Sequence, residues 1–142
     1  MAIQEHPLIG SILVCDFRGF SEPEMVKRRP VVVISPKIAA RPGLCTVVAL
    51  SMTPPAPVLS FHCQIDIAPP LPADLFSSTG VWVKGDMVYS VGFHRLDLIR
   101  TGKTPQGKRS YYYSTLSHEQ IKTIRECVLK GLGLSVLTKH LP

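Results

Sequence analysis

Short apolar runs, separated by segments rich in proline and glycine, dominate the chain and predict a mainly β protein. Several runs are rich in valine and isoleucine, the β-branched residues that strands favour. They predict strands over residues 11–17, 29–35, 44–51, 58–67, 81–91 and 109–115. The 13 prolines and 10 glycines indicate many turns, as in a small barrel or sheet of short strands.

Two of these predicted strands carry a finer pattern. Residues 58–67 place Phe61, Cys63 and Ile65 on one side, which predicts a strand with one buried face. Gly85 interrupts the run 81–91 and indicates a β-bulge or a close approach of another backbone.

The flanks of other strands are less regular. Pro30 has no N–H to give to a sheet, so we expect it to open its strand. Residues 93–100 fit either a short strand or a helical turn, and residues 101–107 a polar loop.

One helix is predicted near the C-terminus. Ser117 and Gln120 form a capping box, in which each side chain satisfies a free backbone N–H. Gly131 and Gly133 are placed to end the helix. Apolar residues recur at helical spacing between these signals, at Ile121, Ile124, Val128 and Leu132.

The length and charge narrow the possibilities further. A chain of 142 residues fits one domain, residues 1–142, which can bury a core without disulfides or metals. The net charge of +6 favours an anionic partner, such as nucleic acid or an acidic protein.

The cysteines and the N-terminus indicate a cytoplasmic protein. None of the four cysteines forms a Cys-x-x-Cys pair, so we expect buried, reduced thiols and no metal site. No signal peptide is visible, and the longest apolar runs are far shorter than the ~20 residues that span a bilayer.

Several segments in order resemble the PemK/MazF toxins of type II toxin-antitoxin systems. A first strand that begins at Gly10 and ends in Asp16-Phe17 is similar to theirs, and so is the Arg-Pro strand that starts at Arg29. The next family strand ends in Thr or Ser, matched here by Ser51. The resemblance covers about residues 10–100 and 117–134, up to a Gly-Leu-Gly-Leu ending.

This resemblance implies an SH3-like β-barrel with a C-terminal α-helix. It also implies a homodimer that cleaves single-stranded RNA, such as mRNA, without a metal or other cofactor. The partner would be a cognate antitoxin whose acidic tail occupies the active groove.

Metal-free cleavage needs a base for the ribose 2′-OH, donors for the charge on phosphorus, and an acid for the leaving oxygen. Arg29 is the central candidate, because a guanidinium can hold two phosphate oxygens at once. Glu24 lies where the family loop carries an acid and is a candidate base, with Glu22 as a rival. A structural salt bridge is the alternative role for Arg29.

Further candidates follow the later strands. Ser51, or Thr53 in a shifted register, can donate a hydrogen bond to a phosphate oxygen. Lys84 and Asp86 stand where one family branch has Arg and Asp two residues apart, and side chains two apart on a strand share a face. The alternative is that Lys84 and Asp86 form an ion pair on the surface.

Other basic residues are candidates for RNA binding. Two histidines can act near neutral pH as acid, base or RNA contact. The stretch 100–113 mixes cations with tyrosines, a mixture that suits single strands, and it departs from the family as an added hairpin for RNA, for the antitoxin or for packing. The predicted RNA-binding residues are Lys27, Arg28, Thr53, His62, His94, Lys108 and Arg109.

Two other functions stay open. One is a binding toxin of the related CcdB type, which relies on a C-terminal Trp-Gly-Ile, whereas this chain ends in Lys139-His140-Leu141-Pro142. The other is a regulatory relative that acts only through protein–protein contact. The sequence has no Walker loop, dinucleotide fingerprint or Gly-x-Ser-x-Gly elbow.

Overall fold

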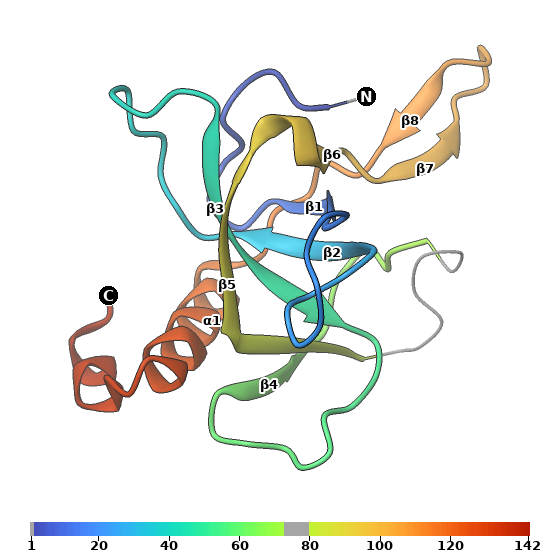
Figure 1. Ribbon diagram of the computed structural model, residues 1–142. Coiled ribbons are helices and arrows are strands. Elements are labelled where there is room, and N and C mark those ends of the chain that lie inside the picture. Colours follow the sequence, from blue (N-terminus) through green and yellow to red (C-terminus); the bar gives the residue numbers. More distant parts are fainter. Residues whose placement is uncertain (1, 73–79) are drawn as a thin grey trace.

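The fold is built mainly of antiparallel strands with one long helix, as seen in a computed structural model that describes residues 2–72 and 80–142 (Figure 1). Six strands form one sheet in the order β4-β5-β3-β2-β1-β6. Their bounds are Ile12–Asp16 (β1), Arg28–Val33 (β2), Leu44–Ser51 (β3), His62–Ile65 (β4), Val81–Gly92 (β5) and Leu96–Asp97 (β6).

The other elements surround this sheet. A short 3₁₀ helix, η1 (Phe93–Arg95), joins β5 to β6, and β7 (Arg100–Lys103) and β8 (Arg109–Tyr111) form a separate hairpin. The helix α1 (His118–Gly131) and a second 3₁₀ helix, η2 (Ser135–His140), complete the chain. The predicted mainly β fold with a C-terminal helix is confirmed, but within the described residues the sheet stays open and does not close into a barrel.

Alternation along the strands divides the buried side chains between the two faces of the sheet. The helix-side core lies under α1 and includes Val32, Val48, Leu50, Val83, Ile124 and Cys127. The loop-side core packs beneath the β1–β2 loop and includes Cys15, Phe17, Met25, Val31, Val33 and Ala49. Neighbouring residues of β2 and β3 therefore point into different cores.

Gly85 allows α1 to lie directly on β5. A Cβ atom there would stand 2.5 Å from the carbonyl carbon and oxygen of Cys127 and 2.7 Å from the carbonyl oxygen of Phe61. The pairing of β5 with β3 also shifts in register here, between the Leu50–Val83 and Val48–Val88 pairs. The prediction of a bulge or close backbone approach at Gly85 is confirmed in both respects.

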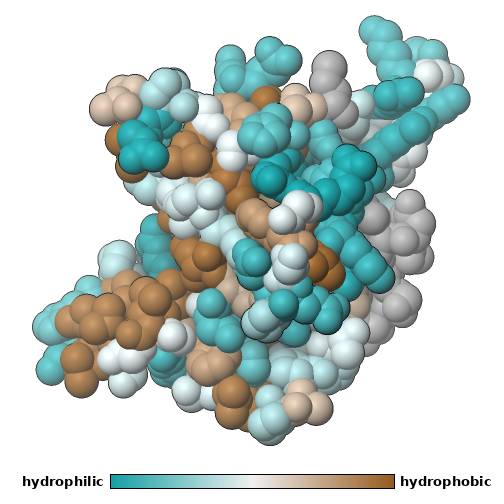
Figure 2. Space-filling view, viewed as in Figure 1, coloured by the Kyte–Doolittle hydropathy of each residue, from teal (hydrophilic) through white to brown (hydrophobic). Residues whose placement is uncertain are grey.

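The predicted helix signals are confirmed at its start and partly at its end. The Ser117 hydroxyl accepts the Gln120 N–H, and the Gln120 side chain accepts the Ser117 N–H, as a capping box requires. Leu132, however, lies beyond the last turn and is 63% exposed, so it does not continue the buried stripe. Together with Leu134, Val136 and Leu137 it forms an exposed apolar surface at the C-terminal end (Figure 2).

Four predicted strand boundaries are wrong, and one of them is the strand expected over 109–115, which ends at Tyr111 as β8. The strand expected over 58–67 is only β4, because a turn bonds the His62 N–H to the Leu59 carbonyl and leaves Val58 exposed. The expected loop 101–107 is partly strand, since β7 runs to Lys103. Pro30 is the third residue of β2; it pairs with Val14 of β1, while the pairing with β3 begins one residue later.

The four cysteines are free thiols. Three are buried as predicted, whereas Cys63 is partly exposed. Burial raises the pKa of the Cys15 thiol to about 12, so this thiol stays protonated at neutral pH. Within residues 2–72 and 80–142, no helix has the length and apolar character that spanning a membrane requires.

Candidate active site

Arg29 lies at the start of β2, between two neighbouring strands. It pairs with Cys15 of β1, and the β2–β3 register, continued by two residues from the Val31–Ala49 pair, places it opposite Ser51. Val31 and Ala49 belong to the loop-side core, so Arg29 and Ser51 continue that same face of the sheet. The backbone therefore presents a guanidinium and a hydroxyl side by side.

The Arg29 side chain is exposed and has no protein partner among the described residues. No hydrogen bond or ion pair involves its guanidinium there. Its neighbour Arg28 differs, because an Arg28 guanidinium nitrogen lies 3.8 Å from a carboxylate oxygen of Asp97. Of these two arginines, only Arg29 keeps all its donors available for a ligand.

Ser51 and Thr53 form one hydroxyl-bearing turn at the end of β3. The Thr53 N–H donates to the Ser51 hydroxyl (3.1 Å), which in turn donates to the Thr53 carbonyl (3.3 Å). Ser51 and Thr53, the two candidates for the hydroxyl donor, thus lie in the same turn. Trp82 of β5 is the cross-strand partner of Ser51, which sets Arg29, Ser51 and Trp82 in one row across the sheet.

Lys84 on β5 and His62 on the edge strand β4 lie next to this row. They are cross-strand partners in the β4–β5 pair, beside the Gln64–Trp82 pair. The Nδ1 atom of His62 accepts the N–H of Leu59 at 3.0 Å, so a neutral His62 carries its proton on Nε2. The structure brings the Lys84 and His62 side chains to neighbouring positions.

Asp86 lies where the strand pattern breaks. The register shift between Val83 and Val88 interrupts the alternation, so the two-residue spacing alone does not set Lys84 and Asp86 on one face. A Cβ atom at Gly131, where α1 ends, would stand 3.0 Å from the Asp86 Cα and N atoms. Asp86 is exposed beside the end of α1.

Glu24 lies in the β1–β2 loop, residues 17–27, above the loop-side core. Its carboxylate accepts the Ser21 N–H at 3.3 Å, and within the described part of the chain no contact joins it to Arg29. The next residue, Met25, is buried and donates its N–H to the Tyr89 hydroxyl (2.9 Å). The loop is thus fixed to β5 directly beside Glu24, while the Glu24 side chain is exposed. Glu22 is exposed in the same loop.

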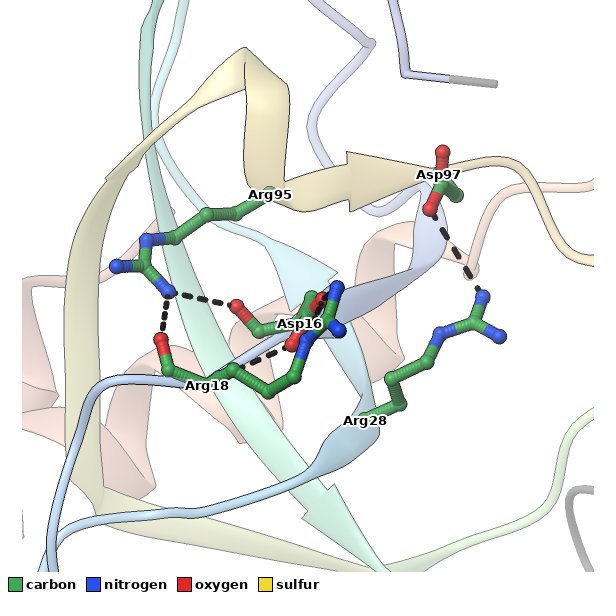
Figure 3. A network of polar contacts seen from close by, with 5 residues as sticks. All are labelled: Asp16, Arg18, Arg28, Arg95 and Asp97. Atoms are coloured by element: carbon green, nitrogen blue, oxygen red, sulfur yellow. Dashed lines mark hydrogen bonds and ion pairs between the residues drawn. The ribbon is translucent and has the colours of Figure 1, made fainter.

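Arg95 and Asp16 hold the first part of this loop (Figure 3). The Arg95 guanidinium donates to the carbonyls of Asp16 (2.9 Å) and Arg18 (2.8 Å) and lies 4.9 Å from the Phe20 ring centroid. Asp16 accepts from the Arg18 side chain at 2.7 Å, and this bond lowers the pKa of its carboxyl. The aspartate of the Asp-Phe motif therefore shapes the loop.

The remaining predicted residues lie apart from this row. His94, in η1, is at the far end of β3, since Gly92 pairs with Leu44; the length of β3 is roughly 25 Å. Lys108 and Arg109 lie in the β7–β8 hairpin. Lys27, exposed and with φ of 68°, immediately precedes β2. No group of three or more His, Cys, Asp or Glu residues within the described ranges could hold a metal ion.

Sequence reasoning missed three residues that shape the site: Trp82, Tyr89 and Arg95. Trp82 could have been found, because the buried residues Val81 and Val83 flank it and alternation turns it to the opposite face. Tyr89 and Arg95 could not, because each acts on the β1–β2 loop from more than 60 positions away.

Comparison with known proteins agrees with the family resemblance of the sequence. Residues 9–132 match the family described as PemK-like, MazF-like toxins of type II toxin-antitoxin systems. The chain is 32% identical to the uncharacterized protein YifN of Escherichia coli (strain K12), with 94% of this chain and 96% of YifN covered. It is 28% identical to an uncharacterized protein of Haemophilus influenzae, with 96% and 98% covered.

Solved structures of the same fold are similar as well. MazF from Deinococcus radiodurans matches with a TM-score of 0.57 and 22% identity, covering 92% of this chain and 99% of that protein. The Mycobacterium tuberculosis toxin MazF-mt6 matches with a TM-score of 0.54 and 16% identity, covering 87% and 96%. At these identities the likeness shows a shared fold.

Proposed function

Because the chain belongs to the PemK-like, MazF-like family of type II toxins, we propose that it is a sequence-specific, metal-independent endoribonuclease that cleaves single-stranded RNA. The observation that carries this proposal is the Arg29 side chain, which is exposed and unpartnered among the described residues. A structural arginine would be expected to bind a carboxylate or a carbonyl, as Arg95 and Arg28 do.

The reaction needs no group from outside the protein and the RNA. The ribose 2′-oxygen loses its proton to a base and attacks phosphorus, the bond from phosphorus to the 5′-oxygen breaks, and an acid of the site gives a proton to that oxygen. The products are a 2′,3′-cyclic phosphate and a 5′-hydroxyl end. Negative charge grows on the phosphate oxygens in between, and a guanidinium fork beside a hydroxyl donor is suited to hold it.

In this proposal the row across the sheet binds the scissile phosphate. Arg29 and Ser51 hold its oxygens, and Lys84 adds a positive charge from β5. Glu24, exposed in the loop before β2, or Asp86, exposed on β5, takes the 2′-OH proton. Trp82 offers a ring on which a neighbouring base can stack.

The proposal includes two protein partners. As a type II toxin, the chain has an antitoxin as its natural partner, and the positive charges of Arg29 and Lys84 are suited to an acidic antitoxin segment. A second copy of the chain is the other partner. The exposed apolar residues Leu132, Leu134, Val136 and Leu137 offer a surface for it, because patches of this kind commonly mark protein interfaces.

The test is cleavage of a long RNA by the purified protein in EDTA, with mapping of the ends. We expect cuts at one recurring short sequence, with 5′-hydroxyl ends, and no cuts in the same RNA carrying 2′-O-methyl groups. Cleavage that requires added Mg²⁺, or 5′-phosphate ends, would contradict the proposed chemistry. No cleavage under any condition would favour a toxin that acts only by binding a protein.

A further inference from the structure

The β7–β8 hairpin carries positive charge without any acidic residue. From Leu98 to His118 the chain has no Asp or Glu. It has four cations in that stretch, Arg100, Lys103, Lys108 and Arg109, and all four are exposed. Among the residues that the structure describes, none of the four has an ion-pair partner.

The hairpin projects from the body of the protein as an ordered arm (Figure 1). Its strands pack chiefly on each other. Bonds within it close the turn: the Thr104 N–H donates to the Lys108 carbonyl (2.6 Å) and the Gly107 N–H to the Thr104 carbonyl (2.8 Å). Tyr112 fixes the base, because its side chain is buried and its hydroxyl donates to the Pro69 carbonyl at 3.0 Å. The arm adds little to the core.

The arrangement of charge within the arm opposes its own stability. Lys103 and Arg109 are directly opposite each other in the β7–β8 pairing. Like charges at such positions repel and destabilise a two-stranded ribbon. A hairpin kept only for packing would gain from an acid at one of these positions. The cation pair is suited to an anionic ligand, which would offset this repulsion.

Aromatic side chains stand at the base of the arm. Tyr113 is 72% exposed and meets Tyr111 edge to face, with the two ring centroids 6.4 Å apart. Both line an open, mostly apolar cleft of about 680 Å³ between the arm and the N-terminal segment. An exposed tyrosine beside a cleft is suited to stack an unpaired nucleobase.

The arm starts near the strand that carries Arg29. Arg28 contacts Asp97 across β2 and β6 (Figure 3), and Asp97 lies three residues before Arg100, where the arm starts. The arm itself is largely hydrophilic (Figure 2). Between Arg100 and Arg109 Pro105 is its one apolar side chain, so it lacks the apolar centre typical of protein interfaces. Phosphate binding needs cations alone.

We propose that the β7–β8 hairpin is an RNA-binding arm that holds the substrate strand beyond the cleavage site. Its cations bind the phosphates, and Tyr113 stacks on a base. The proposal rests on the proposed ribonuclease function and adds to it a second contact region for single-stranded RNA, apart from the Arg29 row. Short substrates would not reach this region.

The first experiment measures binding of a fluorescent 20-nucleotide RNA made uncleavable by 2′-O-methyl groups. The variant Lys108→Gln/Arg109→Gln should bind about tenfold more weakly at low salt. Its slope of log K against log salt should fall by about 1.4, or about 0.7 for each phosphate that the variant no longer neutralises. Lys37→Gln/Arg41→Gln is the matched control, because both are exposed cations in the β2–β3 loop, and it should bind like the wild type. Equal weakening in both variants, or none in either, would overturn the proposal.

The second experiment tests stacking. Tyr113→Ala should weaken binding of the same RNA at least about fivefold, whereas Tyr113→Phe, which keeps the ring, should not. Since Tyr113 is 72% exposed, neither change should alter folding. Identical binding by both variants would remove Tyr113 from the arm's function.

A third comparison separates failure of the arm from failure of the ribonuclease proposal. If the protein cuts RNA, the hairpin variant should lose activity on a 20-nucleotide substrate but not on a six-nucleotide one. Equal activity on both would overturn the arm and leave the ribonuclease standing. If the protein cuts no RNA but its binding still depends on the hairpin, the arm stands and the ribonuclease fails. Loss of binding to a polyglutamate peptide, with RNA binding intact, would assign the arm to an acidic protein instead.

Discussion

The Arg29 end of the sheet and the β7–β8 hairpin are both basic and exposed, yet they are built in opposite ways. Arg29 stands on β2, which is paired on both sides and whose buried residues belong to both cores. The hairpin pairs only with itself and reaches outward. The phosphate that reacts must be held in a fixed geometry. The rest of the RNA needs only to stay bound, and a projecting arm is enough for that.

This contrast has consequences for mutation. Changes beneath the Arg29 row should act on the stability of the whole fold, because β5, β3 and α1 meet there. Changes within the hairpin should act on its own order and on binding, because the hairpin can open without unfolding the rest. Substitutions in each region can break or sharpen the comparison.

The largest effect on stability is expected for Gly85→Ala. The new methyl group would stand 2.5 Å from the backbone of Cys127 and 2.7 Å from that of Phe61, so α1 must move away from β5. The free energy of unfolding should fall by about 3 kcal/mol or more, the upper end for overpacking. Urea denaturation measures it.

Gly107→Ala, in the hairpin turn, is the control for this prediction. Its methyl group meets no atom within 4 Å, and only the backbone strain at φ of 79° remains. That strain costs about 1–2 kcal/mol locally and should hardly change global unfolding. Equal destabilisation by the two variants would contradict the contrast between sheet and arm.

A smaller effect is expected where the hairpin joins the body. Tyr112→Phe removes the hydrogen bond to the Pro69 carbonyl and should lower the free energy of unfolding by about 1 kcal/mol. Tyr113→Phe removes the same atom from an exposed ring and should have no measurable effect. If both changes are neutral in thermal denaturation, Tyr112 does not anchor the arm.

The smallest effect concerns pH and the Cys15 thiol, whose residue pairs with Arg29 across β1 and β2. Burial raises the pKa of Cys15 from 9.0 to about 12, so the folded state keeps a proton that the unfolded state loses. Stability from this group is complete below pH 9 and should decline as pH rises from 9 towards 12. The fall in unfolding free energy between about pH 8 and about pH 10.5 should be shallower in Cys15→Ala than in the wild type. An equal fall in unfolding free energy with pH in the variant and the wild type would contradict this prediction.

Local patterns predicted much of this structure. Gly43 and the proline-rich segment after Ser51 bound β3, and the predicted range 44–51 matches it at both ends. The capping box at Ser117 was equally informative, because it depends only on residues within one turn. The pattern at 58–67 misled, because Leu59 and His62 close a turn whose bonds no alternation can show.

The same division between local and distant signals applies to the candidate site. Arg29 could be found from its own strand, since the Arg-Pro signal is local. Its place opposite Ser51, and the place of Trp82 beside Ser51, depend on the register of three strands far apart in sequence. Arg28 is occupied by an ion pair with Asp97, about 70 residues away, whereas Arg29 has no such partner among the described residues. A contact over this distance in sequence cannot be predicted from local signals.

The most direct test of the central claim compares RNA cleavage by Arg29→Ala, Arg41→Ala and the wild type in EDTA. Arg41 is an exposed arginine in the β2–β3 loop and controls for the loss of charge. We predict that Arg29→Ala lowers the cleavage rate at least about 100-fold, with the free energy of unfolding unchanged within about 0.5 kcal/mol. Arg41→Ala should cleave like the wild type. Wild-type cleavage by a folded Arg29→Ala would contradict the account.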